Sequence, residues 1–470
     1  MLKNKIQSEI LSHLNFNPTL GQMAAIDGFA NFVVNPKPDS CILLKGYAGT
    51  GKTSIIAGYV KTLEKLKVKF ELLAPTGRAA KVLTEYSGAK AHTIHKCIYR
   101  QKNMKEGMGR FVLNYNKLTN AIFIVDEASM LSDFSFEDSA FGSGKLLSDL
   151  IEFVQQGNNC RLILVGDTAQ LPPIGLDISP ALNYSELANF NLDVKEFFLN
   201  EVVRQQSDSG ILHNATLIRT ILDSGIIETP KFSVEGFDDI EKITGGELLE
   251  YLSEEYNKNG REGNVVVCYS NKRANRYNNG IRSRILFHEE ELSVGDYLIV
   301  ARNSYFWIDD IPDISFIANG DVVEVTRIGK RYEMYGFRFA DVTIRLLDDN
   351  QQLIDVRIIL DSLMMDGPSL GSEHMKNLYQ QIATDYSHIK THKARLTKIK
   401  EDPFFNAMQV KFAYAVTCHK AQGGQWPNIF IDQGFFKPEM LTREYLRWLY
   451  TAITRATNKV YLVNFDESFF

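Results

Sequence analysis

The sequence predicts an α/β protein with two parallel-sheet halves and a small antiparallel barrel inserted into the second half. Short apolar runs that end in a polar or glycine-containing turn alternate with helical stretches, as buried parallel strands do. Four of these runs precede residue 205 and three follow residue 260. A different pattern, in which apolar and polar residues alternate, begins at residue 293. These three observations indicate two α/β halves that share a cleft.

The apolar runs are the predicted strands of the two sheets. In chain order they are CILLKG at 41, FELLAP at 70, AIFIVDE at 121, RLILVGD at 161, NVVVCYS at 264, NIFIDQ at 428 and VYLVNF at 460. Strands that alternate with helices form parallel sheets, and such sheets bind ligands at the carboxyl ends of their strands. We therefore look for chemistry directly after these runs.

The stretch from 293 to about 365 predicts the inserted barrel. VGDYLIVARNS, NGDVVEVTRI and FADVTIRLL alternate around Asn-Gly and Gly-Asp turns, which is typical of antiparallel strands. Residues 373–402 follow as a charged helical segment, whose basic side chains form either a solvated face or a contact for a strand or partner. The predicted domains are residues 1–205, then 206–292 together with 409–470, with 293–408 as the insertion.

Composition sets wide limits on function. A chain of 470 residues exceeds the size of one hydrophobic core, so two or more domains are expected. The formal net charge of −5 argues against a protein that coats nucleic acid by bulk attraction, but it leaves room for a local basic channel. The five cysteines suggest neither a disulfide framework nor a zinc site. Because no apolar run reaches the roughly 18 residues of a membrane span, we expect a cytoplasmic protein.

A phosphate-binding loop follows the first predicted strand and precedes a helical run. The segment reads G-x-x-x-x-G-K-[ST], in which glycines let backbone N–H groups face phosphate at a helix N-terminus. Lys52 is expected to reach the β and γ phosphates of ATP, and Thr53 to ligate Mg²⁺. The other predicted nucleotide-binding positions of the loop are Gly46, Ala48, Gly49, Thr50 and Gly51.

Two adjacent carboxylates end the AIFIV strand, where they are poor choices for stability alone. We assign Asp126 to the metal and Glu127 to the activation of water, because a hydrolase needs a base that a small-molecule phosphotransferase does not. Gln170, after the next strand, is placed to sense the γ-phosphate. These residues favour ATP hydrolysis, with a P-loop kinase of small molecules as the rival of a different class.

In order and spacing, the motifs of nearly the whole chain resemble those of superfamily 1B helicases of the RecD and Dda type. This resemblance implies two RecA-like domains with an SH3-like barrel, ATP and Mg²⁺ as cofactors, and 5′ to 3′ movement on single-stranded DNA with unwinding of tailed duplex DNA. It also implies that Gln22 reads adenine, that Arg204 contacts the γ-phosphate and that Arg455 acts as an arginine finger. Gly423 belongs to a motif that couples the strand to the nucleotide.

The same resemblance assigns residues to the bound strand. APTGRAAK at 74 resembles motif Ia, AHTIH at 91 motif Ib and YAVTCHKAQGGQ at 414 motif V, while SNKRANRYNNGIR at 270 matches the family pattern after the first strand of the second half. Hydroxyls, helix N-termini and basic side chains suit phosphate. The expected nucleic-acid contacts are Pro75, Thr76, Arg78, Thr93, His95, Asn271, Thr417, His419 and Lys420.

Strand separation is the least determined part of the function. Residues 98–120, with Phe111 and Tyr115, stand where relatives carry a duplex-splitting hairpin, although a plain surface loop fits equally well. An ATP-driven switch that does not unwind, and a motor subunit of a larger nuclease, therefore stay open as alternatives. The resemblance also suggests protein partners in repair or recombination, and a monomer fits the sequence.

Overall fold

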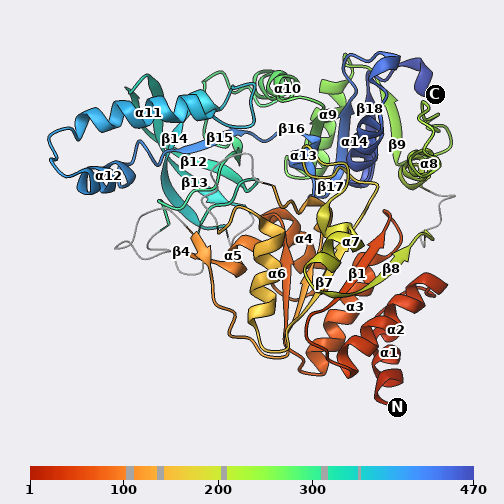
Figure 1. Cartoon of the computed structure of the whole chain (residues 1–470). Helices are drawn as coiled ribbons and strands as arrows, with labels where there is room; N and C mark the ends of the chain where they lie inside the picture. The colour runs from red at the N-terminus through yellow and green to blue at the C-terminus, as the bar shows by residue number, and fades with distance from the viewer. Residues whose placement is uncertain (102–110, 135–141, 203–208, 309–315, 348–350) are drawn as a thin grey trace.

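The computed structural model describes the whole chain except residues 102–110, 135–141, 203–208, 309–315 and 348–350. Figure 1 shows a first lobe that carries the N-terminus at the bottom of the view, a second lobe at the upper right, and a barrel with two outlying helices at the upper left. No described helix is both long and apolar enough to cross a bilayer.

The first lobe is a six-stranded parallel sheet in the order β3-β2-β6-β7-β1-β8. Its strands are β1 Ser40–Gly46, β2 Phe70–Ala74, β3 Ala91–Thr93, β6 Ile122–Val125, β7 Arg161–Gly166 and β8 Asp193–Leu199. Its helices are α1 Leu2–Ser12, α2 Leu20–Val34, α3 Lys52–Lys65, α4 Gly77–Ser87, α5 Ile94–Ile98, α6 Leu146–Gln156 and α7 Tyr184–Asn189. Apolar clusters cover both sheet faces, as in a doubly wound fold.

The second lobe is a five-stranded parallel sheet in the order β16-β10-β17-β18-β9. Its strands are β9 Ile240–Ile243, β10 Asn264–Cys268, β16 Ala415–Thr417, β17 Trp426–Asp432 and β18 Ala456–Val463. Its helices are α8 Gly210–Ser224, α9 Leu248–Asn259, α10 Asn271–Arg284, α13 Cys418–Ala421 and α14 Arg443–Ile453. Helix α14 is buried on almost every side, because it lies between its own sheet and loops of the first lobe.

All seven predicted strands are confirmed, but the strand count was too low. The sequence indicated four strands before residue 205 and three after residue 260, whereas the sheets contain six and five. β3 and β16 have three residues each, and so short a segment shows neither an apolar run nor an alternation of apolar and polar residues. β8 and β9 are sheet edges that mix exposed and buried positions, so they lack the continuous apolar run of a central strand.

The barrel is closed by five strands: β11 Tyr297–Val300, β12 Val322–Met334, β13 Phe337–Leu346, β14 Leu353–Ile359 and β15 Met408–Phe412. Helices α11 Ser372–Asp385 and α12 His392–Lys400 leave the barrel after β14 and return before β15. They pack on its outer surface through a separate apolar cluster that includes Phe337, Phe339, Leu378 and Ile382. The predicted boundary between residues 408 and 409 falls inside β15, which belongs to the barrel.

A short antiparallel pair, β4 Tyr99–Gln101 and β5 Phe111–Leu113, projects from the first lobe toward the barrel. The ring of Phe111 is buried 4.4 Å from the ring of Tyr305, whereas Tyr115 is exposed. This pair is the base of the predicted 98–120 hairpin, whose tip lies outside the described residues. Short 3₁₀ helices complete the described elements at Ala128–Met130, Pro180–Leu182, Leu360–Ser362, Pro438–Met440 and Glu467–Phe469.

Candidate nucleotide and nucleic-acid sites

The loop between β1 and α3 has a shape that only glycine accommodates. Gly49 and Gly51 have φ angles of 75° and 81°, in the left-handed region that side chains disfavour. A Cβ at Gly51 would lie 2.7 Å from the Nε2 atom of Gln22. Gly51 is also the N-cap of α3, so the loop presents its N–H groups at a helix N-terminus.

Gln22 supports this loop from behind. Its Oε1 accepts a hydrogen bond from the Thr19 N–H in a capping box that starts α2, and its Nε2 donates to the carbonyl of Thr50 at 2.8 Å. The side chain is fully buried, and both ends of its amide are engaged within the protein. Its predicted contact with adenine stays a prediction.

Lys52 and Thr53 open onto a cavity of about 300 Å³. The Nζ of Lys52 donates to the carbonyls of Gly46 and Tyr47 at 2.7 and 2.8 Å and lies 4.0 Å from Asp167. These partners hold the ammonium at the floor of the loop, within the cavity that a triphosphate would enter.

The acid pair after β6 faces the same cavity. Burial, followed by the charge of Glu127, raises the pKa of Asp126 to about 6. Glu127 has a φ of 53°, and this left-handed conformation turns the chain sharply at the strand end. Both carboxylates are half-buried, and Glu127 is directed across the cleft toward Arg455.

Arg455, from the second lobe, meets Glu127 and Gln170 in a buried cluster. Its Nη1 donates to Glu127 Oε1 at 3.0 Å, and its side chain is 5% exposed. With the amide of Gln170 oriented to satisfy both neighbours, Oε1 accepts from Arg455 Nη2 at 2.8 Å and Nε2 donates to Glu127 Oε2 at 3.3 Å. Three of the five predicted catalytic groups are thus in mutual contact across the lobes. Of the other two, Lys52 lies in the phosphate-binding loop and Arg204 lies outside the described residues.

Gly423 lies at a close contact between the two lobes beside the nucleotide cavity. Its φ is 72°, and a Cβ there would lie 2.9 Å from that of Ala79 and 3.3 Å from the Thr76 hydroxyl. Since Thr76 begins α4, this contact joins the nucleotide cavity to the predicted DNA-binding motif of the first lobe.

Tyr450 is a functional candidate that the sequence did not single out. Its hydroxyl donates to Asp167 Oδ2 at 2.7 Å and accepts from the N–H of Ala48 at 2.7 Å. It therefore links α14 to the phosphate-binding loop and to the β7 end. Its place in the YTAITRA segment, one helical turn before Arg455, was the available signal.

A second cavity, of about 650 Å³, lies between the lobes and beneath the barrel. Of the predicted nucleic-acid contacts, six line it: Thr76, Arg78, Asn271, Thr417, His419 and Lys420. The guanidinium of Arg78 stacks 3.8 Å from the ring centre of Trp426, so this arginine also joins the lobes. Barrel residues Asn319 and Gly320 complete the wall.

Lys420 carries the clearest electrostatic feature of this cavity. Within the described part of the chain its Nζ is buried without a hydrogen-bond partner, and burial lowers its pKa to about 8. Burial also lowers the pKa of the neighbouring His419, which favours its neutral form. A partly charged amine in an enclosed polar cavity suits a phosphate, which would complete its hydrogen bonds.

Three predicted contacts do not line this cavity. Pro75 is half-buried behind it, and the Thr93 hydroxyl caps α5 by accepting from the N–H of Lys96. Burial lowers the pKa of His95 to about 4, and its ring packs 5.7 Å from that of Tyr99. Their contact with nucleic acid stays a prediction.

The cavity also contains groups that the sequence did not reveal. Tyr269 is 47% exposed and packs on Trp448 from one side, and Lys272 stands on the first turn of α10. Trp426, beneath Arg78, belongs to the first residues of β17. Aromatic rings at such positions suit stacked bases, but only the fold brings them to the cavity.

Two family models match the chain, one near each end. An AAA domain covers residues 21–221, and a UvrD-like helicase C-terminal domain covers residues 412–463. These ranges hold the phosphate-binding loop, the acid pair, motif V and Arg455. The barrel and its two helices lie between them.

Sequence relatives extend across the chain at low identity. The chain is 25% identical to an uncharacterised protein of Methanocaldococcus jannaschii over 94% of its length, and 32% identical to the ATP-dependent RecD2 DNA helicase of Deinococcus radiodurans over 37%. It spans only 38% and 21% of those two proteins. It is 23% identical to the ATP-dependent DNA helicase dda of Enterobacteria phage T4, over 83% of this chain and 87% of that one.

Among solved structures, the chain resembles a Bacteroides Pif1 helicase crystallised with ADP-AlF3 and single-stranded DNA, with 15% identity, a TM-score of 0.47, and coverage of 96% and 93% of the two chains. The motifs keep their order along the chain, and the matched models hold the same residues that the structure gathers at the cleft. The chain is therefore similar, in the regions that the two family models match, to an AAA domain and a UvrD-like helicase C-terminal domain, and in sequence to proteins named as ATP-dependent DNA helicases.

Proposed function

We propose that this protein is an ATP-driven motor that moves 5′ to 3′ along single-stranded DNA and unwinds tailed duplexes. The observation that carries the proposal is the contact of Arg455 with Glu127 across the lobes, 3.0 Å apart and beside the phosphate-binding loop. An arginine from one lobe that meets the base of the other makes hydrolysis depend on closure. A small-molecule kinase has no need of such an arrangement.

In this proposal the residues of the nucleotide cavity divide the work. Lys52 and the loop N–H groups bind the β and γ phosphates, while Thr53 and Asp126 would hold Mg²⁺, which neutralises phosphate charge. Glu127 accepts the proton of the attacking water, and Gln170 orients that water against the γ-phosphate. Arg455 stabilises the charge that develops on the phosphoryl oxygens, and Arg204 is proposed as a second arginine there.

The second cavity is proposed to hold the DNA strand. Thr76 and Arg78 would contact it from the first lobe, and Asn271, Thr417 and Lys420 from the second. Because both lobes contribute residues, a change in the distance between the lobes would change which backbone phosphates these residues contact. The relatives named as ATP-dependent DNA helicases support DNA as the partner, and the 5′ to 3′ direction rests on the family resemblance.

The deciding experiment combines ATP hydrolysis with unwinding. Hydrolysis is measured with and without single-stranded DNA, and unwinding is measured on matched duplexes with a 5′ or a 3′ tail. We expect stimulation by DNA and opening of the 5′-tailed duplex only. Lys52→Ala, which removes the phosphate-binding ammonium, serves as the inactive control for both.

Two results would contradict the proposal in different ways. An ATP hydrolysis rate that does not change with DNA would exclude the motor function and favour a small-molecule kinase or an ATP-driven switch. Hydrolysis that DNA stimulates, without opening of either duplex, would indicate a translocase that needs a partner, as in a larger nuclease complex. One relative is named as RecBCD enzyme subunit RecD, of Buchnera aphidicola, and this chain spans 70% of it. A relative that is a subunit of a larger enzyme makes this second result a concrete alternative.

A further inference from the structure

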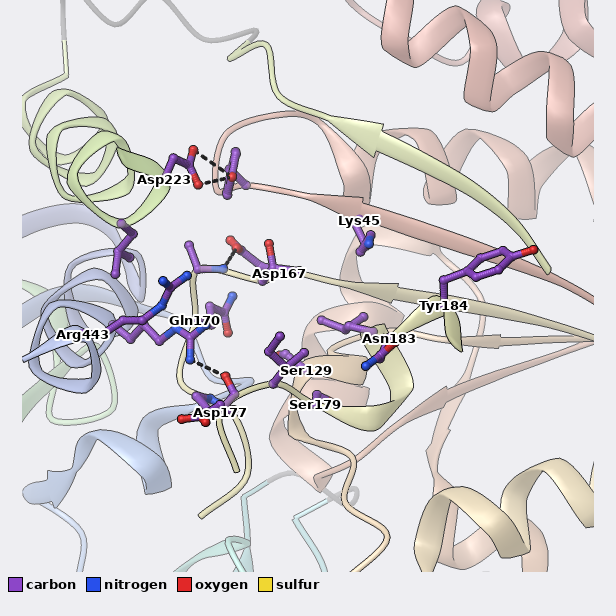
Figure 2. Close-up of a pocket in the computed structure, with 18 residues that line it drawn as sticks. Lys45, Ser129, Asp167, Gln170, Asp177, Ser179, Asn183, Tyr184, Asp223 and Arg443 are labelled. Carbon is purple, nitrogen blue, oxygen red and sulfur yellow. Dashed lines mark hydrogen bonds between the residues drawn. The ribbon is translucent and has the colours of Figure 1, made fainter. Parts of the chain in front are cut away.

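A separate cavity of about 360 Å³ lies next to the nucleotide cavity, on the other side of the β7 end. Tyr47, Asp167 and Gln170 line both cavities and form the wall between them. Figure 2 shows Arg443 and Asp223 on one side of this space and Lys45, Asn183 and Tyr184 on the other, with Ser129 and Ser179 below. None of the proposed catalytic steps uses it.

Two buried polar groups at this cavity have no hydrogen-bond partner within the described residues. They are the Nε of Arg447 and the Oγ of Ser129, whose residues are 7% and 2% exposed. A buried polar atom without a partner is costly, so native proteins rarely leave one unless something completes it. Arg447 comes from α14 in the second lobe and Ser129 from the first, so one small ligand would satisfy both.

The charges around the cavity favour an anion. Arg443 stands one helical turn before Arg447, so two guanidinium groups lie on the same wall. Within the described residues, Arg447 donates one hydrogen bond, from Nη1 to the carbonyl of Asp177. Burial and the nearby charge of Arg443 lower the pKa of Arg447, and the carboxylate of Asp177 opposes this shift only in part.

The carboxylates at the cavity are largely occupied elsewhere. Asp223 accepts the hydroxyl of Tyr47 at 2.7 Å, and Asp167 accepts from Tyr450 and from the N–H of Ala169. Lys45 is paired with Glu196 at 2.7 Å, so it does not neutralise either of them. Asp177 is exposed at the rim. Asp223 and Asp167 are thus held by donors of the protein, whereas Arg447 and Ser129 keep hydrogen-bonding atoms without a partner among the described residues.

We infer that this cavity is a second anion site, which binds a small tetrahedral oxyanion such as inorganic phosphate between Arg447 and Ser129. Planar guanidinium groups bind phosphate oxygens through paired N–H donors, and a serine hydroxyl adds a third. An oxyanion held by both lobes would stabilise their closed arrangement, and with it the contact of Arg455 with Glu127. The site goes beyond the proposed motor function and does not depend on hydrolysis.

Calorimetric titration of inorganic phosphate into the full chain tests this site. The titration is made with a non-hydrolysable ATP analogue at saturation, which fills the phosphate positions of the P-loop. We expect one saturable phosphate site in the wild type, and binding about tenfold weaker in Ser129→Ala and in Arg447→Met, because each loses a hydrogen bond to a charged ligand.

Ser129→Ala keeps the test independent of folding. Its hydroxyl has no hydrogen-bond partner among the described residues, so the melting temperature without phosphate should not fall. Ser179→Ala is the matched control, because the Ser179 hydroxyl lines the same cavity but already donates to the carbonyls of Ala128 and Leu131 at 3.0 Å. It should keep wild-type phosphate affinity. Absence of saturable binding to the wild type, or wild-type affinity in both Ser129→Ala and Arg447→Met, would overturn the inference.

Discussion

At the scale of single residues, the contact between Glu127 and Arg455 governs what the nucleotide cavity can do. Each group is the other's charge partner in a space that excludes most water, so removal of either leaves an uncompensated charge. Gln170 bridges both, which makes the three side chains one unit. Effects of their replacement are therefore expected to be non-additive.

Arg455→Lys should not restore what Arg455→Ala loses. An ammonium cannot contact Glu127 and Gln170 through two separate N–H groups as the planar guanidinium does. We expect kcat to fall about 10³-fold in both variants, the scale typical of an arginine finger. Steady-state hydrolysis gives kcat, and a fluorescent nucleotide analogue checks that binding persists. If Arg455→Lys kept a near-normal kcat, the two-point contact of the guanidinium with Glu127 and Gln170 would not be needed for hydrolysis.

Lys420 predicts a pH dependence of DNA binding. Its pKa is lowered to about 8 in the cavity, and a bound phosphate favours the charged amine. Affinity for single-stranded DNA should therefore be full below pH 8 and should weaken as the pH rises above it. Fluorescence anisotropy with a labelled oligonucleotide between pH 7 and about 9.5 measures this, a range that spans the usual and lowered lysine values.

Lys420→Arg is the matched variant for that measurement, because a guanidinium stays charged throughout this range. We expect a flatter affinity profile than in the wild type. Burial also lowers the pKa of Lys411 to about 8, although its ammonium donates to the carbonyl of Met365 and it does not line the cavity. If the DNA affinity of Lys420→Arg fell with pH as steeply as that of the wild type, the pH dependence would come from a group other than Lys420.

At the scale of elements, α14 joins the lobes through one face. Arg447 donates to the carbonyl of Asp177, Thr451 accepts from the N–H of Leu171, and Tyr450 contacts both Ala48 and Asp167. The helix thus holds the loop after β7 and the phosphate-binding loop together. A shift of α14 would move Arg455, which follows its C-terminal end.

Tyr450→Phe should destabilise the protein by about 1–3 kcal/mol, because the buried Asp167 and the N–H of Ala48 both lose a partner. Tyr59→Phe is the matched control. Tyr59 is also fully buried, but among the described residues its hydroxyl has no partner, so its loss should leave stability unchanged. Chemical denaturation followed by tryptophan fluorescence compares the two, and equal stability would argue against the role of the Tyr450 link.

The parts of the site that the sequence predicted are those encoded by neighbouring residues. The phosphate-binding loop and the acid pair each follow one apolar strand, so a few consecutive positions define them. Tyr450 could not be assigned in the same way, since its contact with Ala48 joins residues 402 positions apart. Trp426 and Tyr269 share this difficulty, because an aromatic residue in a core strand or at its end reads as packing until the second lobe is placed.

At the scale of the whole molecule, the barrel shows how far pattern alone can reach. Its alternating strands were evident from residue 293 onward, but its last strand was not. β15 has the sequence MQVKF, which alternates like the other barrel strands, but it has only five residues and the helical segment 373–402 separates it from them. Its antiparallel pairing with β11 joins residues more than 100 positions apart, so only the tertiary structure reveals it.

The overall negative charge predicts a shallow salt dependence for DNA binding. The cationic side chains that line the proposed strand cavity are Arg78, Lys272 and Lys420. With three phosphates neutralised, the logarithm of affinity should fall with the logarithm of salt concentration with a slope of about −2. Anisotropy titrations at several salt concentrations give this slope. A value several units steeper would place the strand on a different, more basic surface.

The passage from the barrel to the second sheet is only two residues long. Ala413 and Tyr414 separate β15 from β16, and Tyr414 is buried, with its hydroxyl 3.2 Å from Asp296 and 3.0 Å from the N–H of Tyr297. At this connection the barrel and the second sheet are therefore coupled without a flexible linker. A DNA strand under tension that pulls on the barrel would transmit force directly to β16 and then to Thr417, His419 and Lys420. In a single-molecule pulling experiment, the barrel and this sheet should therefore move as one rigid body.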